Sequence, residues 1–176
     1  VSVLGCGTVG LLTLQVLKAS GAEVTAIDVR DESLELAKSM GANFTFNSSK
    51  SNIVESLLSV TDGVGHDIVF ETAGAAETPR MAINYTRKGG KTILVGIYSS
   101  EPKMDFNEIV NFEREVIGSV AASPGDMETA VYLLNEGKID PSSLISAVVP
   151  LDKVIHDGYE RMNKSSKDVF RVLVGS

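Results

Sequence analysis

The first twelve residues, VSVLGCGTVGLL (1–12), carry the strongest structural signal in the chain. A short apolar run typical of a buried strand leads into the spacing G-x-G-x-x-G and then into an amphipathic helix. Gly5 permits a tight turn, Gly7 lets the backbone approach a pyrophosphate, and Gly10 lets the helix pack closely on the strand. The free N–H groups at the helix start favour an anion there. The pattern predicts a dinucleotide-binding turn made by Gly5, Gly7, Thr8, Val9 and Gly10.

The residue that ends the second predicted strand is acidic. Asp28 stands 18 residues after Gly10, close to the ~20-residue offset at which a carboxylate receives the ribose hydroxyls of an adenosine. A 2′-phosphate beside it would be repelled by roughly 4 kcal/mol per unit charge at about 4 Å, which corresponds to about a thousandfold in affinity. We therefore expect NAD to be preferred over NADP. Arg30 either approaches the adenosine and offsets part of this repulsion or is a solvated loop charge.

Short β-branched runs alternate with amphipathic helical stretches along the chain, which predicts an α/β fold: a Rossmann-type, doubly wound, parallel six-stranded sheet with a short C-terminal helix and strand tail. The expected strands are residues 1–4, 23–27, 44–47, 67–71, 91–95 and 115–120. The expected helices are residues 8–20, 31–40, 53–60 and 76–85, followed in the tail by 124–135 and 152–162 and by a strand at 169–174.

Glycines and prolines punctuate these elements. Gly21, Gly41 and the pair Gly89-Gly90 are expected to end three of the helices, and Gly137 is expected to end the helix that begins at Pro124. Pro141 and Pro150 bracket a further apolar segment. We expect residues 1–121 to form the dinucleotide-binding domain and residues 122–176 to pack on it as a tail.

Composition narrows the function classes. The 176 residues include 16 basic and 23 acidic side chains, a net charge of -7, without a Lys/Arg cluster. Nucleic-acid binding is therefore not expected. The single cysteine excludes an internal disulfide, and no apolar run approaches the ~20 residues that span a bilayer. These features predict a cytoplasmic protein that does not bind membranes. Because the chain opens without methionine, directly on an apolar run, we also expect a segment upstream of Val1.

Beyond the glycine turn and Asp28, the chain resembles the coenzyme-binding domain and C-terminal tail of zinc-containing medium-chain dehydrogenases, such as alcohol, sorbitol and threonine dehydrogenases. The segments that carry the resemblance are GCGTVGLL (5–12), AKSMGA (37–42), GHDIVFETAG (65–74), GGKTILVG (89–96) and the run from 137 to 151. The wording at 24–28, 46–49 and 71–74 is most similar to the polyol branch, including galactitol-phosphate-type dehydrogenases.

The resemblance implies a set of cofactor contacts at the carboxyl ends of the strands. Asp28 would hold the adenosine ribose, and the other contacts would be Thr72 and Gly74 in the crevice, Val95, Gly96 and Ile97 beside the nicotinamide, Ser119 to Ala121 at its carboxamide, and Arg171 at the pyrophosphate. Ligands of such sheets bind beyond the carboxyl ends of the strands, near the switch in strand order.

The same family uses a catalytic zinc, for which about three protein ligands are required. Cys6, His66 and His156 do not form such a set: the cysteine occupies the glycine turn as a small buried filler, and both histidines are interpreted as structural or surface residues. The resemblance implies that the zinc ligands and the substrate pocket lie in an N-terminal domain before Val1. The full enzyme would transfer hydride from a secondary alcohol or polyol to NAD, whereas this part would bind NAD(H) without transferring hydride.

The resemblance also implies a homo-oligomer joined through the sheet edge near residues 115–120. Two other hypotheses stay open at this point, because the glycine turn and the acidic strand end occur in more than one class of protein. One is a Rossmann-like methyltransferase. The other is a non-catalytic module that senses dinucleotides.

Overall fold

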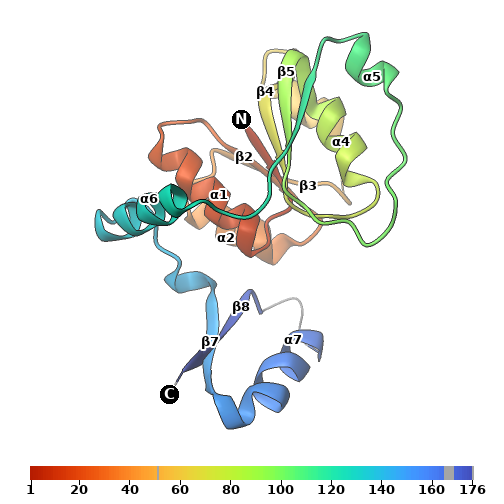
Figure 1. Cartoon of the computed structure of the whole chain (residues 1–176). Helices are drawn as coiled ribbons and strands as arrows, with labels where there is room; N and C mark the ends of the chain where they lie inside the picture. Colours follow the sequence, from red (N-terminus) through yellow and green to blue (C-terminus); the bar gives the residue numbers. More distant parts are fainter. Residues whose placement is uncertain (51, 165–168, 176) are drawn as a thin grey trace.

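A computed structural model describes residues 1–50, 52–164 and 169–175, and its centre is a six-stranded parallel sheet (Figure 1). The strand order is β3-β2-β1-β4-β5-β6, the doubly wound order expected from the sequence. The direction of winding reverses between β1 and β4, which are neighbours in the sheet. The strands are β1 (Ser2–Leu4), β2 (Thr25–Asp28), β3 (Phe44–Asn47), β4 (His66–Glu71), β5 (Thr86–Leu94) and β6 (Glu115–Gly118).

Helices cover both faces of this sheet, as they must when parallel strands are joined by crossovers. On one face, Leu11 and Leu14 of the first helix pack with Val3 and Ala26 of the strands. On the other face, Leu57 packs with Leu4, Ile27 and Val69. The helices are α1 (Thr8–Ala19), α2 (Asp31–Ser39), α3 (Ile53–Ser59), α4 (Thr78–Tyr85), α5 (Asn107–Val110), α6 (Pro124–Asn135) and α7 (Arg161–Lys164).

Glycines end several helices as predicted, with one exception. Gly21 and Gly41 follow α1 and α2 with φ of +83° and +96°, and Gly137 follows α6 with φ of +62°. The prediction that Gly89-Gly90 ends a helix is wrong, because α4 stops at Tyr85 and both glycines lie inside β5. At Gly90 a Cβ atom would lie 2.8 Å from the carbonyl oxygen of Asp67, so this glycine is needed for close contact between strands.

The end of the tail, residues 145–164 and 171–175, forms a small unit of its own, below the sheet in Figure 1. Strands β7 (Ile145–Pro150) and β8 (Arg171–Gly175) pair in parallel as a two-stranded sheet. The apolar segment between the two prolines is therefore largely a strand. The continuous helix expected at 152–162 is wrong: a 3₁₀ turn (Leu151–Lys153) and a π-helical segment (Val154–Glu160) precede the short α7.

The tail is tied to the main sheet at defined points. Leu144, in a 3₁₀ turn (Ser142–Leu144), is 1% exposed and belongs to the apolar cluster of α1 and β1. The side chain of Gln15 donates to the carbonyl of Asp140 at 3.0 Å and accepts from its N–H at 2.6 Å. The division into domains 1–121 and 122–176 remains a prediction.

Candidate functional site at the carboxyl edge of the sheet

The glycine turn after β1 has the backbone geometry that the motif requires. Gly5 has a φ of +96°, and a Cβ atom there would lie 2.7 Å from the amide nitrogen of Ala73. At Gly10 a Cβ atom would lie only 1.8 Å from the carbonyl oxygen of Gly5, so α1 packs directly on the turn. At Gly7, in contrast, a Cβ atom would meet nothing within 4 Å. The turn is thus closed by Gly5 and Gly10 and left open at Gly7, where an anion can approach the backbone.

The N-terminus of α1 faces this open position. Gly7 is its N-cap residue in an extended conformation, and neither a side-chain cap nor an acidic residue occupies the described first turn. The first N–H groups and the positive end of the helix dipole are therefore available to a phosphate. The Thr8 hydroxyl, at the start of the helix, donates to the carbonyl of Phe170 at 2.8 Å.

Asp28 lies beside the glycine turn at the end of β2. Its side chain is 8% exposed, and it accepts one hydrogen bond from the Cys6 N–H at 2.6 Å and another from the Arg30 N–H at 2.9 Å. The Arg30 guanidinium lies 3.5 Å from the carboxylate and 5.8 Å from the ring centre of Phe170. Arg30 is therefore no free loop charge. Each carboxylate oxygen that accepts one donor keeps capacity for a further one.

The loops that follow β4 and β5 complete the edge. The Thr72 hydroxyl donates to the Gly5 carbonyl at 2.7 Å, which joins the first loop to the glycine turn. Gly74 has a φ of +69°, and a Cβ atom there would lie 2.7 Å from the carbonyl oxygen of Ile97. Ile97 itself is 87% exposed.

The predicted residues after β5 and β6 lie next to each other. Val95 and Gly96 both donate their N–H groups to the Glu71 carbonyl, at 2.8 and 3.1 Å. The Ser119 N–H donates to the Leu94 carbonyl at 2.9 Å, which keeps Ser119 beside the end of β5. Ala121, at a φ of 60°, is exposed where the chain leaves the sheet.

Arg171 adjoins a residue that contacts this edge. It is an exposed residue at the start of β8, and the preceding residue, Phe170, receives the Thr8 hydrogen bond described above. The backbone of the tail therefore meets the start of α1 next to Arg171. The sequence did not suggest the role of Phe170, which packs against the apolar cluster and beside Arg30.

A buried carboxylate, Glu71, organises the edge and was not among the predicted site residues. It is the last residue of β4 and is 0% exposed. It accepts hydrogen bonds from Thr78 and Tyr98. Burial, together with the hydrogen bond to Glu71 and its negative charge, raises the pKa of the Tyr98 phenol. The sequence did contain a signal: a charged residue follows the apolar run 68–70 at the carboxyl end of β4.

A pocket of about 330 Å³ opens between β1, β2 and the loop after β4. Its lining includes Gly5, Asp28 and Thr78, with Val29, Ser48 and Met81 around them. The apolar walls and the single buried carboxylate suit a flat ring system with an attached hydroxylated sugar.

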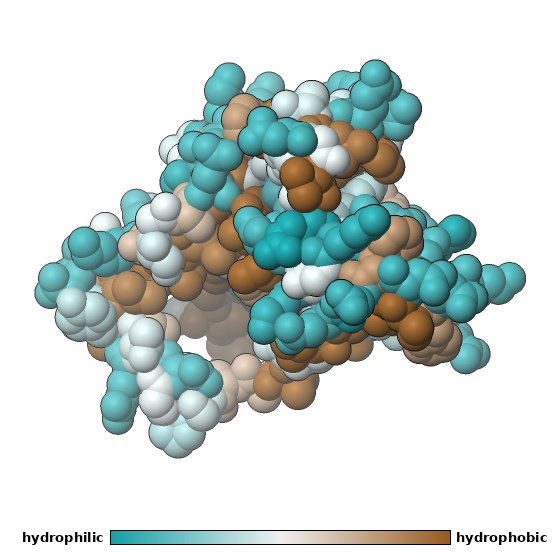
Figure 2. Space-filling model, turned by 90° about the horizontal axis from the view of Figure 1, so that it is seen from above, coloured by the Kyte–Doolittle hydropathy of each residue, from teal (hydrophilic) through white to brown (hydrophobic). Residues whose placement is uncertain are grey.

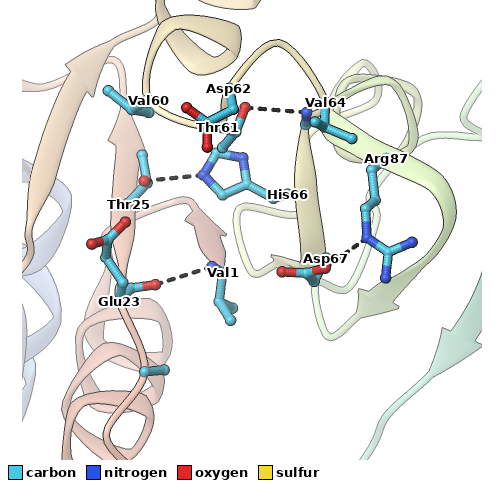
Figure 3. Close-up of a pocket in the computed structure, with 12 residues that line it drawn as sticks. Val1, Glu23, Thr25, Val60, Thr61, Asp62, Val64, His66, Asp67 and Arg87 are labelled. Carbon is cyan, nitrogen blue, oxygen red and sulfur yellow. Dashed lines mark hydrogen bonds and ion pairs between the residues drawn. The ribbon is translucent and has the colours of Figure 1, made fainter.

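A second pocket, of about 540 Å³, lies at the opposite edge of the sheet, where β1, β2 and β4 begin (Figure 3). His66 lies there, 3% exposed, with its Nε2 3.0 Å from the Thr25 hydroxyl. Burial, and secondarily the positive charge of the chain's amino group, lowers the pKa of His66 to about 4. We do not assign this pocket to the cofactor, because the glycine turn and Asp28 lie at the other edge.

Comparison with known proteins identifies the family. The sequence profile described as "Zinc-binding dehydrogenase" matches residues 8–136. The chain belongs to this family. It is 33% identical to the sorbitol dehydrogenase of Halalkalibacterium halodurans over 163 residues, which cover 89% of this chain and 47% of that protein.

The solved structures of two dehydrogenases agree with this assignment. The 2R,3R-butanediol dehydrogenase of Bacillus subtilis superposes with a TM-score of 0.90 at 30% identity, covering 99% of this chain and 50% of that one. The galactitol-1-phosphate dehydrogenase of Escherichia coli superposes with a TM-score of 0.84 at 33% identity, covering 93% and 50%. The chain thus spans about half the length of the relatives it matches, and the methyltransferase and sensor hypotheses find no support.

The family description names zinc, but the described residues do not fit a zinc site. Cys6 is buried in the glycine turn, where burial raises the pKa of its thiol and its Sγ lies 3.7 Å from the Ile27 carbonyl oxygen. His156, on the tail, is 81% exposed. In the part of the chain that the structure describes, no three His, Cys, Asp or Glu side chains gather closely enough to hold a metal. We therefore derive no step through zinc.

Among the residues that the structure describes, no helix is long and apolar enough to cross a membrane.

Proposed function

We propose that this chain is the NAD-binding half of an alcohol or polyol dehydrogenase. The observation that carries the proposal is the pairing of an open backbone position at Gly7, in front of the start of α1, with the buried carboxylate of Asp28. A dinucleotide needs both an anion site for its pyrophosphate and an acceptor for its ribose hydroxyls. The anion site and the ribose acceptor lie side by side, because Asp28 accepts a hydrogen bond from Cys6 of the glycine turn.

In this proposal the predicted residues divide the cofactor among them. Gly7 and the first N–H groups of α1 would receive the pyrophosphate, with Arg171 approaching from the tail. Asp28 would accept the ribose hydroxyls, and the pocket beside it would take the adenine. The nicotinamide would lie across Val95 to Ile97, near Ser119.

In this proposal the chain's residues orient the cofactor and do not themselves react. Bound NAD supplies the hydride acceptor of the reaction. Ile97 and Gly74 would limit the ring to one face, while the zinc ligands and the substrate pocket would belong to a part of the enzyme outside these 176 residues. The chain alone would therefore bind NAD(H) and transfer no hydride. A cytoplasmic location also remains a prediction.

The choice between the two dinucleotides tests the role of Asp28. Titration of the chain with NADH and with NADPH, followed by calorimetry, should show NADH bound at least about tenfold more tightly. Asp28→Asn should reduce this ratio, because it keeps the side-chain shape and removes the charge. Asp152→Asn, at an exposed position in the tail, is the matched control. Equal affinity of the unmodified chain for both dinucleotides would contradict the proposal for Asp28.

We further propose that the chain self-associates through β6, the strand at one edge of the sheet. An exposed edge strand offers unpaired N–H and C=O groups to a second copy. Ile117 on this strand is 42% exposed and Val120, just beyond it, is 85% exposed. Figure 2, which views the molecule from above, shows apolar residues at several places on this face among hydrophilic ones. Sedimentation should show a dimer that Ile117→Lys converts to a monomer; a monomeric unmodified chain would refute this part.

A further inference from the structure

Glu71 receives four hydrogen bonds, and one of them joins two separate loops. Its Oε1 accepts from the N–H groups of Ala73 and Gly74 and from the Thr78 hydroxyl, each at 2.8 Å. These three donors all belong to the segment that follows β4. The fourth donor, the Tyr98 hydroxyl, binds Oε2 and comes from the loop after β5. Among the residues that the structure describes, the side-chain link between Glu71 and the loop after β5 therefore passes through a single phenol.

The two loops also touch at their backbones, where side chains would not fit. A Cβ atom on Gly96 would lie 2.5 Å from the Glu71 Oε2 and 2.6 Å from the Gly74 amide nitrogen. The corresponding atom on Gly74 would lie 2.7 Å from the Ile97 carbonyl oxygen. Small shifts of either loop would therefore change the wall formed by residues 95–97. Tyr98 directly follows this wall and holds it to Glu71.

The burial and charge of Glu71 strengthen its hydrogen bond with Tyr98. Glu71 is 0% exposed, so its carboxylate is shielded from water and interacts more strongly with each donor than an exposed one would. Hydrogen bonds to a charged acceptor are about twice as strong as those between neutral groups. Removing the phenol hydroxyl would leave one side of a buried carboxylate without this donor, which favours rearrangement of the loops.

We propose that Tyr98 is a positioning residue: through Glu71 it holds the loop after β5 against the loop after β4, and so fixes the wall on which the nicotinamide half of the dinucleotide rests. The inference rests on the proposed function. It assigns no such role on the adenosine side, because other hydrogen bonds hold Asp28 and the glycine turn: the Cys6 N–H donates to Asp28, and the Thr72 hydroxyl donates to the turn. Tyr98 therefore acts on one half of the ligand.

Because Tyr98 acts on the nicotinamide half alone, the experiment compares a ligand that has this half with one that lacks it. Tyr98→Phe retains the ring and removes only the hydroxyl. Calorimetry should show that its affinity for NADH falls about tenfold, because an apparent dissociation constant rises as the binding-competent loop arrangement becomes less populated. Affinity for ADP-ribose, which has the adenosine and pyrophosphate parts but no nicotinamide, should stay unchanged. The fluorescence anisotropy of bound NADH should also fall, since the nicotinamide would be held less rigidly.

Two variants serve as comparisons. Tyr132→Phe removes a hydroxyl from a residue that is 58% exposed on α6 and should change neither affinity. Glu71→Gln keeps the side-chain shape but removes the charge that all four donors share, so its NADH affinity should fall at least as far as that of Tyr98→Phe.

The outcomes separate this inference from the proposed function. Equal loss of NADH and ADP-ribose binding in Tyr98→Phe would indicate a general structural role and overturn the inference, as would unchanged NADH binding and anisotropy. Either result leaves the proposed function intact if the unmodified chain binds NADH. If the unmodified chain binds ADP-ribose but gains nothing from the nicotinamide, the inference is overturned; if it binds neither ligand, the proposed function fails with it.

Discussion

At the scale of single residues, Gly10 and Gly7 of the same turn differ in the space that they leave for a side chain. Gly10→Ala would place a Cβ atom 1.8 Å from the Gly5 carbonyl oxygen, so the backbone of the turn or of α1 must move. We expect the free energy of unfolding to fall by about 1–3 kcal/mol or more, as in overpacked cores. Urea denaturation of the two proteins measures this difference.

Gly7→Ala is the matched control for stability and a test for binding. Its Cβ atom meets nothing within 4 Å, and the φ of Gly7 is an ordinary -77°. Stability should therefore change by less than about 0.5 kcal/mol. NADH affinity should nevertheless fall, because the added methyl would occupy the place proposed for the pyrophosphate. Normal NADH binding by Gly7→Ala would argue against a pyrophosphate at this position.

The buried histidine predicts a pH dependence of stability. Burial lowers the pKa of His66 to about 4 from 6.5, so between these values the unfolded chain binds a proton that the folded chain does not. The contribution of His66 to the free energy of unfolding is fully present above pH 6.5 and is lost as the pH falls toward 4, which amounts to about 3 kcal/mol. His66→Gln should show a shallower decrease in urea denaturation between pH 7 and pH 4.5. Parallel pH profiles would exclude this role for His66.

At the scale of elements, α6 depends on its cap. The described helix has no buried residue, so packing stabilises it little. Ser123 and Asp126 form a capping box, in which the Ser123 hydroxyl accepts from the Asp126 N–H and the Asp126 carboxylate accepts from the Ser123 N–H at 2.7 Å. The hydrogen bonds that the Ser123 N–H and, secondarily, the Ser123 hydroxyl donate to the Asp126 carboxylate lower the pKa of Asp126.

Removal of the cap should loosen α6 without unfolding the sheet. Ser123→Ala should cost about 1 kcal/mol of helix stability, equivalent to roughly fivefold faster amide hydrogen exchange in α6. Ser143→Ala, outside this helix, should leave the exchange unchanged. Identical exchange rates in Ser123→Ala and the unmodified chain would contradict the capping role.

At the scale of the whole molecule, the tail contributes to the core of the main sheet. Leu144 is 1% exposed among residues of α1, β1 and β2, although it lies far along the chain from them. Leu144→Ala should lower the free energy of unfolding by about 2–5 kcal/mol. Leu151→Ala, at a position that is 74% exposed, should change it little. If thermal unfolding showed the same stability for Leu144→Ala as for the unmodified chain, the tail would not stabilise the domain.

The sequence alone predicted the parallel sheet, the helix starts at Thr8, Asp31 and Ile53, and the glycine turn with Asp28 at the end of β2. These features are encoded locally: apolar periodicity, helix signals and glycine spacing act within a few residues of one another. Strand ends were less well predicted, since β5 begins at Thr86 and includes the glycine pair that was expected to end a helix.

Only the tertiary structure revealed that Glu71 receives Tyr98, that Thr8 binds Phe170, and that the tail forms a separate two-stranded sheet. Tyr98 stands 27 residues from Glu71, and Phe170 stands 162 residues from Thr8. No local pattern in the sequence specifies such pairs. They form because the parallel sheet brings the carboxyl ends of its strands to one edge and the chain returns to that edge, so the physical cause of these contacts is the packing of distant segments.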